Sequence, residues 1–363
     1  MAEIADKEPN KEPKMNNWRL ICTMSGVGVL LLILWMPCSA DAPVLSGTTY
    51  GVVITQRMYL PEYPCRINDA RYSNKTDFET RTVTILQPYQ DGQPLHDRPV
   101  VFFVHGGGWT DGYADWYTDI LTPTLVAEQG WVVVNVDYRL TANEVTFAAG
   151  TTSCPTPWSS EPIDSDKVAW YDENLQDVAA AFEWTVQNIE SYGGDVQNIF
   201  LFGHSAGGHL ISLLATHDDY RALRGHIRGV ISMSGAYNLK ELNALFDPAL
   251  DQTFYGGHTD EAALDEASPG VYLRAGETLP SFYVLHCQYD LPSLPEQAIS
   301  FRNKLETLGY EVEWDYLLGY THESEMTAIT GAQETVTQSI VGYIETHVRK
   351  IVYLPLIVRD PAQ

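Results

Sequence analysis

Short apolar runs alternate with amphipathic segments along most of the chain, and this alternation constrains the fold more than any other feature. The runs at residues 99–104, 131–136 and 198–202 are continuous and rich in β-branched and aromatic residues, as strands covered on both faces are. Residues 175–190 carry apolar side chains at three- and four-residue spacing and end near Gly193, a helix stop. Strands alternating with helices predict an α/β fold, with a mostly parallel central sheet and helices on both faces.

The same patterns predict the remaining elements. Strands are expected at residues 82–86, 228–233, 280–287 and 311–317, with an edge strand at 50–54, and helices at 116–129, 206–216, 294–308 and 335–348. Two stretches, 141–171 and 238–278, lack a regular pattern and resemble insertions. Long insertions after parallel strands often form lids or pocket walls, and the alternative is loops without a role in the site.

The first forty residues are predicted to lie outside the folded domain. An apolar run at residues 20–36 follows Arg19 and ends before Pro37-Cys38-Ser39-Ala40. Small residues at Cys38 and Ala40 fit a secretory cleavage site, whereas an uncleaved run of this length would be a short membrane anchor. Both interpretations predict an extracytoplasmic location, either secreted or periplasmic, with residues 20–40 as the alternative anchor.

The chain has five cysteines, and in an oxidising location cysteines can form disulfides. Cys65 and Cys154 both lie in proline-containing segments and either form a disulfide or remain two unpaired thiols. Cys287 ends an apolar run, so a buried thiol is expected there.

The charge of the chain excludes two classes of partner. Asp and Glu number 47 against 22 Lys and Arg, which gives a net charge of −25. A protein that binds nucleic acid through phosphates needs a basic face, and so does one that docks on an anionic membrane. We therefore expect no nucleic-acid partner, and membrane contact only through the N-terminal segment.

The motif GHSAGG at residues 203–208 directly follows one predicted strand and opens a predicted helix. In this context G-x-S-x-G is typical of a nucleophile elbow, in which a strained turn presents the serine hydroxyl at a helix N-terminus. Ser205 is therefore the candidate nucleophile. His204 and His209 flank it, but their position at a helix start suits a structural role better than that of its base.

A second motif, HGGGW at residues 105–109, follows the strand at 99–104. Consecutive glycines can direct backbone N–H groups at one point. Gly107 and Gly108, together with the N–H of Ala206, are the candidate donors of an oxyanion hole. His105 is expected to organise the loop and not to act as a base.

A serine nucleophile needs a base, and the base needs a carboxylate to orient it. Asp290 and His322 each lie just past a predicted strand, and the order serine, acid, histidine matches that of α/β-hydrolases. Asp315 and Glu323 are weaker candidates for the acid, because the first lies within a strand and the second is too close along the chain to His322. No metal-ligand spacing or phosphate-binding loop occurs in the sequence, so neither metal nor cofactor is expected.

Taken together, the motifs resemble those of α/β-hydrolase serine esterases in the hormone-sensitive-lipase, feruloyl-esterase and kynurenine-formamidase-like branch. The resemblance covers residues 82–348 and rests on HGGGW, VDYRL at 136–140, GHSAGGH, HCQYD at 286–290 and GYTH at 319–322. It implies the α/β-hydrolase fold, the triad Ser205, Asp290 and His322, and an oxyanion hole from Gly107, Gly108 and Ala206. The long insertion after residue 140 departs from the simple family pattern and affects the pocket more than the mechanism.

The sequence pattern and the resemblance together divide the chain into a lead-in at residues 41–80, a catalytic domain at 81–350 and a tail at 351–363. It implies hydrolysis of a small-molecule carboxylic ester, short-chain or aromatic, through an acyl-enzyme. Two alternatives remain open at this point. One is amide hydrolysis of aryl formamides by the same triad, and the other is a non-catalytic binding module on the same fold.

Overall fold

The computed structural model describes residues 48–57, 82–109, 112–138, 140, 171–246, 261–331 and 334–349. The predictions made for residues 1–40, for Cys65 and Cys154, for the insertion up to residue 170 and for the tail at 351–363 lie outside these ranges. Among the helices within them, none combines the length and hydropathy that a bilayer crossing requires.

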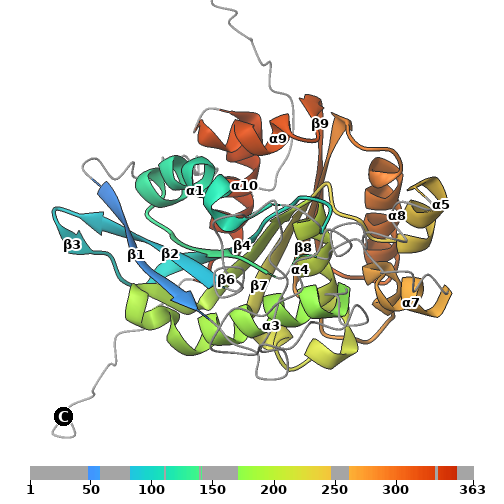
Figure 1. Cartoon of the computed structure of the whole chain (residues 1–363), viewed down its shortest axis with the longest axis horizontal. Helices are drawn as coiled ribbons and strands as arrows, with labels where there is room; N and C mark the ends of the chain where they lie inside the picture. The colour runs from blue at the N-terminus through green and yellow to red at the C-terminus, as the bar shows by residue number, and fades with distance from the viewer. Residues whose placement is uncertain are drawn as a thin grey trace, which may run out of the picture. The chain divides into compact units, whose positions relative to one another are not determined.

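A mostly parallel sheet forms the centre of the described domain (Figure 1). Within the described ranges it has nine strands, in the order β1-β2-β5-β4-β6-β7-β8-β9, with the short β3 paired to β2. The pairings from β5 through β4, β6, β7 and β8 to β9 are all parallel. The strands are β1 (Thr48–Arg57), β2 (Thr82–Gln90), β3 (Gln93–Pro94), β4 (Arg98–Val104), β5 (Val132–Val136), β6 (Gly194–His204), β7 (Ile227–Met233), β8 (Ser281–Tyr289) and β9 (Val312–Thr321).

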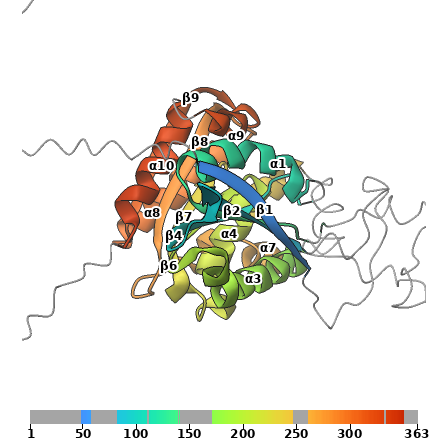
Figure 2. The ribbon, with the colours of Figure 1, turned by 90° about the vertical axis from the view of Figure 1, so that its left-hand side faces the viewer.

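Helices cover both faces of this sheet, as Figure 2 shows. One face packs against α3 (Tyr171–Asn188), α4 (Ala206–Thr216) and α8 (Leu294–Thr307), and the other against α1 (Ala114–Leu121) and α10 (Thr335–His347). Successive strand residues point to opposite faces, so Phe102 joins the first core and Phe103 the second. The predicted α/β fold with two covered faces is confirmed.

The first strands depart from the parallel arrangement. β2 runs antiparallel to both β1 and β5, so the sheet has an antiparallel edge. Only the short β3 and two short connections lie between β2 and β4 along the chain, which leaves no room for the helical crossover that would make β2 parallel to the strands that follow. The edge strand expected at residues 50–54 is present as β1.

Two other segments differ from their sequence patterns. The helix expected at residues 116–129 is α1 followed by a π-helical stretch, Thr122–Glu128, with Pro123 at its start. Proline lacks an N–H and disturbs the α-helical ladder, which explains the change there. The segment at 238–278, expected to lack regular structure, contains α5 (Leu239–Phe246) and α7 (Glu261–Glu266), helices too short to give a clear periodicity.

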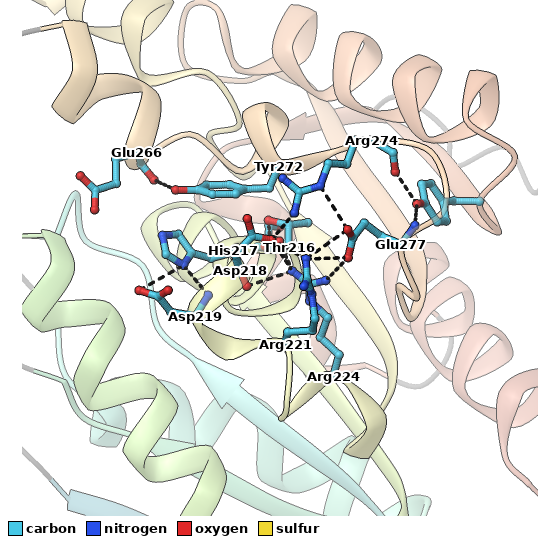
Figure 3. A network of polar contacts seen from close by, with 12 residues as sticks. Thr216, His217, Asp218, Asp219, Arg221, Arg224, Glu266, Tyr272, Arg274 and Glu277 are labelled. Atoms are coloured by element: carbon cyan, nitrogen blue, oxygen red, sulfur yellow. Dashed lines mark hydrogen bonds and ion pairs between the residues drawn. The ribbon is translucent and has the colours of Figure 1, made fainter.

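A network of charged side chains closes the C-terminal end of α4 (Figure 3). The buried Arg224 guanidinium donates to the carbonyl oxygens of Thr216 and His217, which helix formation leaves without partners. Arg224 also pairs with Glu277 at 3.2 Å, and Glu277 pairs with Arg274 at 3.1 Å. The network therefore fixes the end of α4 opposite to Ser205.

Candidate active site

Ser205 occupies the turn between β6 and α4 in a strained backbone conformation. Its φ is 55° and its ψ is −120°, a region that residues with a side chain rarely adopt. Its N–H donates to the Met233 carbonyl at 2.9 Å, and its carbonyl accepts from the His209 N–H at 3.0 Å. These bonds hold the turn, so the half-buried Ser205 side chain stands at the N-terminus of α4.

The two glycines of the motif permit this turn by allowing backbone segments to approach. A Cβ on Gly203 would lie 2.5 Å from the Gly207 carbonyl carbon, and a Cβ on Gly207 would lie 2.0 Å from the Val104 carbonyl oxygen. Neither distance is compatible with a side chain. The spacing G-x-S-x-G is therefore required here by the packing of α4 against β4 and β6.

Asp290 and His322 lie at the ends of the neighbouring strands β8 and β9, and the structure brings them together. The Asp290 Oδ1 atom is 2.6 Å from His322 Nδ1, and the side chain of Asp290 is fully buried. Asp290 also accepts hydrogen bonds from the Ser234 hydroxyl at 2.6 Å and from the Leu291 N–H at 2.8 Å. Burial by itself raises the pKa of Asp290, but the bonds from His322 and Ser234 outweigh it, so the pKa lies below its ordinary value.

An ionised Asp290 fixes the imidazole tautomer. A carboxylate only accepts, so His322 Nδ1 carries the proton and the other ring nitrogen, Nε2, is left as a base. Among the described residues no hydrogen bond joins the Ser205 hydroxyl to His322, and such bonds often shorten only when a substrate is bound. The ring of His322 nevertheless lies next to the turn, with its centroid 4.7 Å from that of His204.

The glycine loop after β4 approaches the same turn. A Cβ on Gly106 would lie 3.1 Å from the Ser205 Cβ, so the loop backbone runs directly past the serine. Gly107, Gly108 and Trp109 all have positive φ, at 120°, 56° and 61°. Glycine adopts this conformation readily, and Trp109 is held in it by its contacts.

Trp109 ties this loop to α4. Its indole Nε1 donates to His209 Nδ1 at 3.0 Å, and His209 Nε2 lies 2.7 Å from the Ala267 carbonyl, to which it donates. Burial lowers the pKa of His209 to about 4, although the bond to Ala267 opposes the shift. His209 is therefore neutral at neutral pH and links three segments, which agrees with the structural role expected for it.

The two other candidate acids and His105 do not take part in the pair formed by Asp290 and His322. Asp315 accepts from the Tyr283 hydroxyl at 2.5 Å and from Ser339 at 2.8 Å, and Glu323 is exposed to solvent. His105 stacks on Tyr138, with ring centroids 4.3 Å apart, and organises the loop as expected.

An apolar cavity of about 180 Å³ opens beside the serine. Gly108 and Ala206 line it together with Ser205, whereas the exposed Gly107 is not among the described residues that line it. The other lining residues are mostly aliphatic: Trp109, Ser234, Ala236, Leu242, Leu291 and Leu294. The cavity therefore offers an apolar wall next to the Ser205 side chain.

Sequence reasoning missed Ser234 and part of the cavity wall. Ser234 directly follows β7 and has a φ of 47°, so it stands at the same sheet edge as Asp290. A polar residue after a buried parallel strand was the available signal. Leu242 lies in the segment 238–278, which was predicted as a possible pocket wall. Leu291 gave no signal, because its place at the cavity depends on how the loop after β8 packs.

One group of three side chains in the described ranges has metal-ligand proximity. Atoms of His204, His322 and Glu325 lie within 4.8 Å of one another. His322 Nδ1 donates to the Asp290 carboxylate and His204 Nε2 donates to a backbone carbonyl at 2.8 Å, so these two nitrogens offer no lone pair. His322 Nε2 keeps its lone pair, which the candidate base requires.

Two family models match parts of the chain. One, described as the carboxylesterase family, matches residues 173–244, and the other, described as BD-FAE, matches residues 85–155. Together they cover the glycine loop and the serine turn, where the chemistry of the site is concentrated.

Characterised proteins and solved structures are similar over longer regions. The probable isoprenylcysteine alpha-carbonyl methylesterase ICMEL2 of Arabidopsis thaliana is 27% identical over 253 residues, 65% of this chain and 53% of that relative. Versiconal hemiacetal acetate esterase of Dothistroma septosporum is 27% identical over 244 residues, 62% of this chain and 66% of the relative. The structure of esterase B from Lactobacillus Rhamnosis has a TM-score of 0.58 at 18% identity, covering 85% of this chain and 88% of that one.

These matches differ in what they establish. The chain spans about half the length of the plant methylesterases, 53% and 56% of two of them. The structural similarity, at this low identity, establishes the fold.

Proposed function

We propose that this chain, a member of the α/β-hydrolase superfamily, is a serine hydrolase that cleaves carboxylic esters. The observation that carries the proposal is the 2.6 Å bond between Asp290 and His322 beside the strained turn that presents Ser205. A buried carboxylate, an oriented imidazole and a serine at a helix N-terminus are the parts that acyl transfer requires.

In the proposed mechanism His322 removes the proton of the Ser205 hydroxyl as its oxygen attacks the ester carbonyl. Asp290 holds the imidazole and stabilises the imidazolium that forms, and its low pKa keeps it ionised for this role. His322 then passes the proton to the leaving alcohol. A water molecule repeats the sequence on the acyl-enzyme and releases the acid.

The negative charge that develops on the carbonyl oxygen needs donors that are already in place. We assign this role to the backbone N–H groups of Gly107, Gly108 and Ala206. The lining of the cavity by Gly108 and Ala206 supports two of the three, and the positive φ values of both glycines support a shaped loop. Each such donor is worth about 3 kcal/mol in the barrier.

The cavity supports a preference for small acyl groups. Its volume of about 180 Å³ and its aliphatic wall suit a short acyl chain or a single aromatic ring. The names of two relatives, a methylesterase and an acetate esterase, also refer to small ester groups. We therefore propose short-chain or aromatic esters as substrates.

A panel of p-nitrophenyl acetate, butyrate and octanoate and a methyl cinnamate-type ester tests this proposal with the purified full chain. We expect hydrolysis of the acetate and butyrate esters, and loss of activity by at least about a thousandfold in Ser205→Ala and His322→Gln. Ser300→Ala, an exposed serine on α8, is the matched control and should retain full activity. Folded wild-type protein that cleaves no ester, or Ser205→Ala that equals wild type, would contradict the proposal.

We also propose an extracytoplasmic location, which rests on the apolar run and cleavage pattern in residues 1–40. Expression of the full chain in a bacterial host, followed by fractionation and N-terminal sequencing, tests it. A mature protein that begins at Asp41 outside the cytoplasm supports the proposal, and an intact N-terminus in the cytoplasmic fraction contradicts it.

A further inference from the structure

A fully buried carboxylate lies behind the candidate active site without an assigned role. Glu325 belongs to α9 (Ser324–Thr327), three residues after His322, and its side chain is 0% exposed. Among the described residues neither of its oxygens accepts a hydrogen bond of good geometry. Burying a carboxyl group away from water is costly unless a partner compensates it, so Glu325 calls for an explanation.

A polar side chain close to Glu325 is that of His204, the residue immediately before the candidate nucleophile. His204 Nε2 lies 3.3 Å from Glu325 Oε1 and 2.8 Å from the backbone carbonyl oxygen of His322. A carbonyl oxygen only accepts hydrogen bonds, so Nε2 must carry the proton. The Nε2–H group of His204 therefore donates to the main chain of His322, and the Glu325 carboxyl group lies beside it.

His204 also contacts the ring of His322. The two ring centroids are 4.7 Å apart and the ring planes are inclined by 42°. His204 itself is 5% exposed and sits at the end of β6, where the parallel pairs with β4 and β7 fix its backbone. The buried His204 side chain therefore contacts both the backbone and the ring of His322.

The charge of Glu325 reaches its other neighbours as well. Burial raises the pKa of the Cys287 thiol, and the charges of Glu325 and Asp290 raise it further. Cys287 therefore remains a neutral thiol, and His204 Nε2 lies 3.3 Å from Glu325 Oε1. His204 and Glu325 are best described as a pair.

We propose that His204 and Glu325 are positioning residues that hold His322 for catalysis, an inference that rests on the proposed serine hydrolase function. Asp290 fixes the His322 ring through Nδ1, while the pair fixes its backbone carbonyl and one face of the ring. The Glu325 carboxyl group lies 3.3 Å from His204 Nε2 and so favours, through its charge, the orientation in which this nitrogen donates to His322. Because a catalytic base misplaced by about 1 Å loses up to 100-fold in rate, a second anchor of this kind affects turnover and not substrate binding.

Two substitutions at Glu325 separate this role from packing. Glu325→Gln keeps a polar oxygen beside His204 Nε2, and Glu325→Met keeps the length of the side chain but offers no oxygen there. We expect Glu325→Gln to stay within about threefold of wild-type kcat and Glu325→Met to lose about tenfold or more, with KM changed less than about twofold in both. Glu323→Gln, exposed in the same turn, is the matched control and should equal wild type.

Fluorophosphonate labelling gives a second readout, because its rate depends on activation of Ser205 and not on ester binding. Labelling of Glu325→Met should slow by the same factor as kcat, at an unchanged thermal unfolding midpoint. If Glu325→Met is unfolded, His204→Gln, which has no ring to contact His322, becomes the test and should lose kcat by about tenfold with KM changed less than about twofold. Equal losses in Glu325→Gln and Glu325→Met, wild-type kcat in Glu325→Met, or wild-type kcat in a folded His204→Gln would each overturn the positioning role.

These outcomes are distinct from failure of the proposed function. If folded wild type neither cleaves esters nor reacts with the fluorophosphonate, the serine hydrolase proposal fails. If wild type is active and Ser205→Ala is inactive while the Glu325 variants behave alike, only the positioning role fails.

Discussion

Protonation of His209 should destabilise the protein as the pH falls, by an amount that follows from its burial. His209 is 0% exposed, accepts from the Trp109 indole and donates to the Ala267 carbonyl. A proton on its accepting nitrogen would face the indole N–H and break that bond. Burial accordingly lowers the pKa of His209 from 6.5 to about 4.

The direction of the effect follows from proton binding in the two states. Between pH 6.5 and 4 the unfolded chain protonates His209 while the folded protein does not, so folding becomes less favourable as the pH falls. The contribution is complete above pH 6.5 and is lost as the pH falls toward 4. A pKa lowered from 6.5 to about 4 corresponds to about 3 kcal/mol of unfolding free energy, which is lost by pH 4.

Urea unfolding of wild type and His209→Gln at pH 7, 5.5 and 4 measures this quantity. The variant lacks the titrating group, and the other acids and histidines are common to both proteins and cancel in the difference. We expect wild type to be the more stable at pH 7, with an advantage that shrinks by about 3 kcal/mol at pH 4. A stability difference that is independent of pH would refute the reasoning that His209 is neutral and buried in the folded state.

Three further perturbations have defined outcomes. Ser234→Ala removes a 2.6 Å hydrogen bond to ionised Asp290 and should lower the unfolding free energy at pH 7 by about 2 kcal/mol in urea titrations. The kcat of this variant on p-nitrophenyl butyrate should fall, while its KM should not change. Arg224→Leu leaves the carbonyl oxygens of Thr216 and His217 without their donor, while Glu277 keeps its ion pairs with Arg221 and Arg274. It should cost about 2 kcal/mol by denaturant unfolding, with kcat per folded molecule retained. Ala236→Leu narrows the cavity of about 180 Å³ and should lower the butyrate-to-acetate ratio of kcat/KM by about tenfold in esterase assays, whereas an unchanged ratio would place the acyl group elsewhere.

Most of the sheet was predictable because each buried strand is a continuous apolar run. The runs around Phe102 and Val134 are apolar on both faces, which only strands covered on both sides require. The direction of β2 was not predictable in this way, since antiparallel and parallel pairing depend on the connection and not on the composition of the strand. The helices α5 and α7 were missed because one or two turns carry too little periodicity.

The candidate site was predictable where a motif records a backbone requirement. The glycines around Ser205 are needed because side chains would collide with α4 and β4, and this requirement leaves a pattern in the sequence. Ser234 and Glu325 leave no such pattern. Their importance depends on distances to Asp290 and His204, residues 56 and 121 positions away along the chain, which only the folded structure defines.

The central claim is that Ser205 is a nucleophile activated by His322 and Asp290, and one experiment tests it most directly. The purified full chain is treated with a fluorophosphonate, and the adduct is located by peptide mass spectrometry in wild type, Ser205→Ala and Asp290→Asn. The account predicts one adduct per chain on Ser205, no adduct in Ser205→Ala and labelling slowed by at least about a hundredfold in Asp290→Asn. An adduct on another residue, or labelling of Asp290→Asn at the wild-type rate, would contradict it.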